Sequence, residues 1–156
     1  MPRLCARQRS VSILRLYSAK PMADRDMMFK TRIEEGRSRR LLPHDGTPLR
    51  ELYMEGNDLA IYTVIENFFS AANGAFWANA GNRSYIRKTV GLQALFDILR
   101  LLLKRDFAEH KAISKQYFLD ILRPARQIDF SDEVFQASGI GRSRIRKAIA
   151  EIIGLE

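Results

Sequence analysis

Residues 85–105 carry apolar side chains around much of a helix, and this pattern constrains the fold more than any other feature of the sequence. The apolar positions recur at helical spacing: Ile86, Val90, Leu92, Leu95, Phe96, Leu99, Leu102 and Leu103. An apolar face this broad needs more than one packing partner, so we expect a buried central helix. Gly91 within it costs about 1 kcal/mol relative to alanine. We therefore expect another stretch of backbone to approach the helix closely at Gly91.

Three further helices are predicted around the central one. Helix-capping residues stand at the expected starts: Asn57 or Asp58 for the first helix, Ser84 for the central helix and Ser114 for the third. No alternating strand pattern appears after residue 55. We predict a mainly α protein, a small helical domain of about four helices. The predicted helices span residues 58–72, 84–105, 114–122 and 142–153.

An aromatic pair, Phe76 and Trp77, falls in the connection between the first two predicted helices. Aromatic side chains on a loop can stack on a nucleic-acid base. They more often fill the gap between two helices, and we interpret this pair as such a plug.

Composition excludes several classes of protein. The chain has 156 residues, of which 46% are hydrophobic and 28% charged, as in globular proteins. No apolar run approaches the roughly 20 residues of a membrane-spanning helix. The single cysteine excludes an internal disulfide framework. Cys5, His44 and His110 are not spaced as the ligands of a zinc site are. We expect neither a metal nor a cofactor, and no membrane contact.

The net charge of +8 is concentrated at the N-terminus, where residues 1–20 contain five basic residues and no acidic one. We predict that residues 1–30 are a basic, loosely ordered extension, followed by a helical domain over residues 31–156. The extension is open to three interpretations: a mitochondrial presequence, a basic arm that touches nucleic acid, or an extension without a selected role. We favour the last and expect a cytoplasmic protein, with the mitochondrial matrix as the alternative.

Two apolar stretches resemble a known family. "DLAIYTVIENFFSAANGAFW" followed by "SYIRKTVGLQALFDILRLLL" resembles the C-terminal half of DGQHR-domain proteins. The similarity covers residues 55–104 best, and the closing "FSDEVFQASGIGRSRIRKAI" also looks like the end of such proteins. The match rests on nine mostly apolar or small positions: Ile65, Phe68, Phe69, Trp77, Lys88, Thr89, Gly91, Ala94 and Leu95.

The resemblance implies a role beside DNA. Members of the family are linked to prokaryotic DNA modification, notably phosphorothioation. The Asp-Gly-Gln-His-Arg segment that names the family is absent, and His44-Asp45-Gly46 shares only some of its letters. The resemblance therefore implies the C-terminal portion of a longer or split protein, whose partners are DNA, other proteins of a DNA-modification complex, or a missing N-terminal half.

The last helix carries the candidate site. A Gly-Ile-Gly sequence runs into a helix with four cations, a pattern suggestive of a helix-hairpin-helix in which backbone N–H groups hold a DNA phosphate. The pattern is imperfect. The usual motif has a small residue six positions after the first glycine and an aliphatic residue nine positions after it, whereas here Ile145 and Ala148 occupy these positions in the reverse order. We predict DNA or phosphate binding by Gly139, Gly141, Arg142, Ser143, Arg144, Arg146 and Lys147. The alternative is that these arginines only solvate the outer face of a terminal helix.

Catalytic motifs are not evident: the sequence has no nucleophile elbow, no phosphate-binding Walker loop and no paired histidines. We predict no catalytic residue, and a non-catalytic module that binds DNA phosphates or a partner protein. The competing hypothesis is a protein-interaction or structural subunit that never contacts nucleic acid and uses the leucine-rich face of residues 85–105 for its partner.

Overall fold

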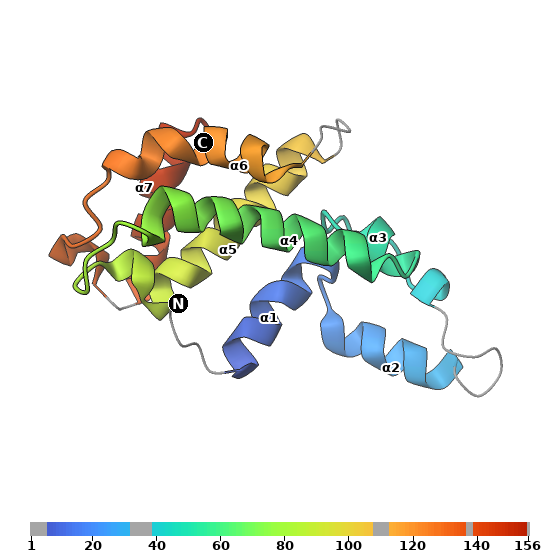
Figure 1. Cartoon of the computed structure of the whole chain (residues 1–156). Coiled ribbons are helices and arrows are strands. Elements are labelled where there is room, and N and C mark those ends of the chain that lie inside the picture. Colours follow the sequence, from blue (N-terminus) through green and yellow to red (C-terminus); the bar gives the residue numbers. More distant parts are fainter. Residues whose placement is uncertain (1–5, 32–38, 108–112, 137–138, 156) are drawn as a thin grey trace. The chain divides into compact units, whose positions relative to one another are not determined.

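The computed structural model describes residues 6–31, 39–107, 113–136 and 139–155 (Figure 1). Within these ranges the chain is helical and contains no strand, which confirms the predicted class. The helix count differs from the expected four, because the described residues hold seven α-helices joined by shorter helical turns. The α-helices are α1 (Ala6–Tyr17), α2 (Pro21–Thr31), α3 (Arg50–Met54), α4 (Asp58–Ala72), α5 (Thr89–Asp106), α6 (Lys115–Leu122) and α7 (Gly139–Ile152).

The chain divides within α4 into two compact units, the first comprising Ala6–Thr63 and the second beginning at Val64. This division does not coincide with the predicted boundary after residue 30. The N-terminal segment also differs from the expected loose extension, because residues 6–31 form α1 and α2. Leu16 is buried at the end of α1, and the Leu49 N–H donates to its carbonyl at 3.0 Å. The end of α1 is thus anchored to the segment that leads into α3.

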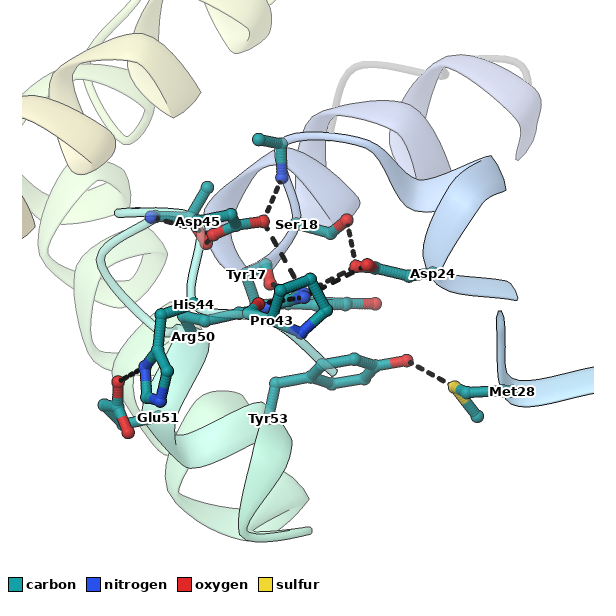
Figure 2. A network of polar contacts seen from close by, with 12 residues as sticks. Tyr17, Ser18, Asp24, Met28, Pro43, His44, Asp45, Arg50, Glu51 and Tyr53 are labelled. Atoms are coloured by element: carbon teal, nitrogen blue, oxygen red, sulfur yellow. Dashed lines mark hydrogen bonds and ion pairs between the residues drawn. The ribbon is translucent and has the colours of Figure 1, made fainter. Parts of the chain in front are cut away.

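A buried arginine holds this N-terminal unit together. Arg50 is 2% exposed and donates to both carboxylate oxygens of Asp24, from Nη1 at 2.5 Å and from Nη2 at 3.0 Å (Figure 2). Its remaining donors reach the carbonyls of Pro43 and Tyr17. All three guanidinium nitrogens therefore have acceptors, as a buried charge requires.

Asp24 and Asp45 surround this guanidinium. The Ser18 hydroxyl donates to Asp24 at 2.6 Å, and the Ala19 N–H donates to Asp45 at 2.7 Å. The hydrogen bond from Arg50 lowers the pKa of Asp24 below its ordinary value of 3.8. A lowered folded-state pKa stabilises the unit above the ordinary value, and this stabilisation is lost as the pH falls through the lowered one. The network joins residues from α1, α2 and α3 and from the segment before α3.

The central helix of the C-terminal unit is α5. Its leucine-rich positions are buried, with Leu95, Ile98 and Leu99 fully so. The close backbone approach expected at Gly91 is confirmed: a Cβ there would lie 2.4 Å from the carbonyl oxygen of Ile86. Ile86 belongs to the short helix η3 (Tyr85–Arg87). The glycine is thus needed to bring η3 onto the first turn of α5.

The aromatic plug is also confirmed. Asn73–Trp77 continue α4 as a π-helical turn, η2, in which Phe76 and Trp77 are buried. Trp77 donates from Nε1 to the Ile86 carbonyl at 2.9 Å, and its ring stacks on Phe69. Trp77 therefore packs between the end of α4 and η3, and Phe76 packs edge-to-face on Phe130.

The predicted caps are partly confirmed. Asn57 accepts from the Ala60 N–H at 3.2 Å, and Ser114 accepts from the Tyr117 N–H at 3.1 Å. Ser84 precedes η3, but its side chain makes no cap hydrogen bond. Tyr117 also donates to the buried Asp106, which links α6 to the end of α5. The pKa of the Tyr117 hydroxyl is raised to about 12, mainly by burial and secondly by this hydrogen bond.

We predict that Arg50→Ala destabilises the protein by about 3–5 kcal/mol, because it leaves the Asp24 carboxylate buried without its partner. Chemical denaturation followed by circular dichroism measures this loss. Arg25→Ala is the matched control, because it removes an arginine whose ion pair with Asp26 is exposed on both sides. The control should change stability by less than about 0.5 kcal/mol. Equal losses for the two variants would contradict the structural role of Arg50.

Candidate nucleic-acid interface

The last helix, α7, starts three residues earlier than predicted and includes the Gly-Ile-Gly sequence in its first turn. It packs against α5 through Ile145, Ile149 and Ala150, all fully buried. Ile149 and Ala150 follow Ile145 by four and five residues, so the three form one apolar stripe along the helix. The exposed side of α7 carries mainly polar side chains, together with Ile140.

Gly141 does not line an open turn. It is buried, and a Cβ built there would lie 1.9 Å from the Gln136 carbonyl oxygen and 2.9 Å from that of Phe135. The sequence predicts that a DNA phosphate approaches Gly141. In the structure this space is occupied by the backbone of Phe135 and Gln136. Gly139 begins the helix, and the preceding residues 137–138 lie outside the described ranges.

Arg142 is used within the fold. It donates from Nε and Nη2 to the two carboxylate oxygens of Asp97 in α5, at 2.7 and 2.6 Å. The Asp97 side chain is 16% exposed, and this hydrogen-bonded pairing raises the pKa of Arg142 above its ordinary value. Bidentate arginine–carboxylate pairs fix orientation as well as contributing energy. The pair therefore sets the rotation of α7 on α5.

The remaining predicted residues lie along the outer side of α7. Ser143, Arg144 and Lys147 are exposed, and Arg146 is half-buried and already interacts with another residue. Arg144 donates from Nη1 to the Val134 carbonyl at 2.9 Å, which orients the guanidinium without neutralising its charge. The structure thus brings Ser143, Arg144 and Lys147 together on one exposed helix.

The charge pattern of α7 is unusual for a helix. Its four cations stand in the first nine residues, and its one acidic residue, Glu151, comes in the last turn. The helix dipole disfavours cations mainly within the first turn, where Arg142 is already paired with Asp97. A bound anion would offset the mutual repulsion of the cations that follow. We name the exposed set Ser143, Arg144 and Lys147 the α7 basic surface.

Sequence reasoning missed three residues that shape this site: Asp97, Gln136 and Val134. Asp97 gave a signal, because a carboxylate interrupts an otherwise apolar helix face and must find a partner there. Gln136 and Val134 act through backbone carbonyls, which no side-chain pattern can reveal.

Other kinds of site lack support in the described ranges. Among those residues, no group of three or more His, Cys, Asp or Glu side chains comes together to hold a metal ion. None of the helices there is long and apolar enough to cross a membrane. No protein-family model, curated protein or solved structure matches the chain. Function therefore has to be inferred from the surface of the protein itself.

We predict that Gly141→Ala destabilises the protein by about 1–3 kcal/mol, because the added methyl group would overlap the backbone of Gln136. Thermal unfolding followed by circular dichroism measures this effect. Gly74→Ala is the matched control: its Cβ would meet only a leucine side chain at an ordinary 3.7 Å. The control should be neutral or slightly stabilising. A stable Gly141→Ala variant would mean that the backbone contact at Gly141 is absent.

Proposed function

We propose that this chain is a non-catalytic DNA-associated module whose α7 basic surface contacts DNA phosphates. One observation carries the proposal: Arg144 and Lys147 are exposed on one side of α7, and neither forms an ion pair with an acidic side chain of the described residues. Phosphate contacts of this kind position a protein on DNA without reading its sequence.

The surrounding structure supports this use of the helix. The ion pair between Arg142 and Asp97 fastens α7 to the buried α5, so the exposed cations stand on a rigid element. The hydrogen bond to the Val134 carbonyl restrains Arg144 in the free protein. Less side-chain entropy is then lost when a phosphate binds.

The resemblance to the C-terminal half of DGQHR-domain proteins adds a biological setting to this proposal. In that setting the chain works in the cytoplasm as part of a prokaryotic DNA-modification system. Its protein partner would be the N-terminal half that carries the Asp-Gly-Gln-His-Arg segment, or another component of the complex. The chemistry of modification would belong to that partner.

The competing hypothesis loses its proposed surface. It requires the leucine-rich face of residues 85–105 to be available to a partner protein. Leu95, Leu99 and Leu102 in that face are at most 1% exposed. This face is buried in the protein's own core and is not available to a partner protein. We therefore favour the DNA-binding hypothesis.

We predict that Arg144→Ala combined with Lys147→Ala weakens binding to duplex DNA and lowers the slope of log K against log salt by about one to two units. The slope falls because binding releases fewer counterions from the DNA when fewer phosphates are contacted. Fluorescence anisotropy with a labelled duplex between about 50 and 200 mM salt measures both quantities. Unrelated duplex sequences should give the same result.

The matched control is Lys104→Ala combined with Lys115→Ala, which removes two exposed positive charges outside α7. The control should keep the wild-type salt slope. Equal slopes for all three proteins would show that the α7 basic surface does not contact DNA. Absence of any binding at the lowest salt would refute the proposed function as a whole.

A further inference from the structure

A recess of about 330 Å³ lies in the C-terminal unit, away from the predicted site residues. It is formed by η2, by the segment from Asn79 to Ser84, and by residues 126–131 after α6. Phe76, Ile86 and Phe130 contribute an apolar part of the lining. Two arginines, two serines, an asparagine and an aspartate contribute the polar part: Arg83, Arg126, Ser84, Ser131, Asn79 and Asp129. A recess in which apolar side chains and converging polar groups meet is typical of small-ligand sites.

The two arginines differ in how they are held. Arg126 donates from Nη2 to the Gly74 carbonyl at 2.7 Å, which fixes its guanidinium beside the recess. Arg83 is exposed and makes no hydrogen bond or ion pair with any described residue. A cation that stabilises nothing in the fold can be removed at little structural cost, which makes Arg83 a sensitive probe of binding.

Ser84 provides an independent indication of a ligand. It is only 7% exposed, yet its hydroxyl has no hydrogen-bond partner among the described residues. Of the side-chain polar atoms there that are fully buried, only Arg100 Nε lacks a partner, so the Ser84 hydroxyl keeps access to solvent. Ser84 lines the recess, so its solvent-accessible hydroxyl can be reached by a molecule bound there. The hydroxyl is therefore a hydrogen-bonding group left available to an occupant.

Asp129 gives the recess an acceptor beside its cations. One of its oxygens, Oδ1, accepts from the backbone N–H and the hydroxyl of Ser131, at 2.9 and 2.7 Å. The other oxygen, Oδ2, makes no hydrogen bond within the described part of the chain. The recess thus offers guanidinium donors for an anionic group and a carboxylate for an N–H donor, on side chains that are exposed to solvent.

We propose that this recess binds a single nucleotide, with its phosphate held by Arg83, Arg126 and Ser84 and the N–H edge of its base facing Asp129. A nucleotide combines all the required features: a dianionic phosphate, a flat apolar body and N–H donors. The volume is at the lower end of the range for small-ligand sites, which suits one nucleotide and no longer segment. The inference rests on the proposed function, because DNA association supplies two sources of this chemistry. These are a free mononucleotide and the 5′-phosphorylated end of a DNA strand.

The test uses the full chain labelled with ¹⁵N and titrated with dGMP, dAMP, the matching nucleosides, inorganic phosphate and a short 5′-phosphorylated single strand. We expect amide shifts at Gly81, Ser84 and Ser131, with a nucleotide or the phosphorylated strand binding at least about tenfold more tightly than nucleoside or phosphate alone. Preference for dGMP over dAMP would fit the pairing of Asp129 with two adjacent N–H groups, and equal binding would still support a nucleotide site. Saturation by the strand but not by free nucleotides would identify a strand end as the source.

Variants separate binding from folding. Arg83→Ala should weaken nucleotide binding about tenfold, and Ser84→Ala about three- to tenfold, while both keep the wild-type melting temperature. Arg123→Ala is the matched control, because it removes an exposed arginine that does not line the recess. No amide shifts with any nucleotide or strand up to about 10 mM would overturn the proposal, as would equal affinity for inorganic phosphate. Unchanged binding in the Arg83 and Ser84 variants would also overturn it.

The two proposals fail separately. Loss of nucleotide binding by Arg83→Ala with normal salt-dependent duplex binding would support the recess as its own site. If duplex DNA does not bind but nucleotides do, the function proposed for α7 is refuted and the recess remains supported.

Discussion

The ion pair between Arg142 and Asp97 determines which side of α7 faces solvent, and the proposed DNA-binding surface depends on this orientation. Two short hydrogen bonds join the start of α7 to the middle of α5. With Arg142 fixed there, Ile145 and Ile149 enter the core and Arg144 and Lys147 point outward. Arg142, which the sequence predicts to bind phosphate, thus fixes the helix so that the neighbouring cations are exposed.

Two glycines make this arrangement compact. Gly91 lets the carbonyl of Ile86 contact the first turn of α5, and Gly141 lets the carbonyl of Gln136 contact the first turn of α7. In both places the approaching group is backbone, which cannot move aside as a flexible side chain would. Both glycines therefore serve the packing of the C-terminal unit, and the proposed contact with DNA involves the side chains of α7 rather than its N-terminal backbone.

Local patterns predicted the helices that local residues determine. The helix at 58–72 was predicted with its observed bounds, because its apolar spacing and the Asn57 cap lie within one stretch of sequence. The helices α1 and α2 are not predicted, because their anchor is the pair of Arg50 and Asp24, separated by 26 residues.

The sequence places the start of α7 too late, because Gly139 is a residue type that is common in turns. The outward position of Arg144 and Lys147 follows from the isoleucine spacing, whereas the pairing of Arg142 with Asp97 spans 45 residues and leaves no periodic signal.

The most direct test exchanges the two charges, Arg142→Asp with Asp97→Arg, and measures duplex DNA binding as a function of salt. The exchange keeps the net charge and can restore the ion pair in reverse, with an acidic residue now in the first turn of α7, where the helix dipole favours it. If Arg142 serves only to fix the helix, the exchanged protein folds and keeps the wild-type salt slope. A folded protein whose slope is lower by about one unit would show that Arg142 itself contacts phosphate and would contradict this account.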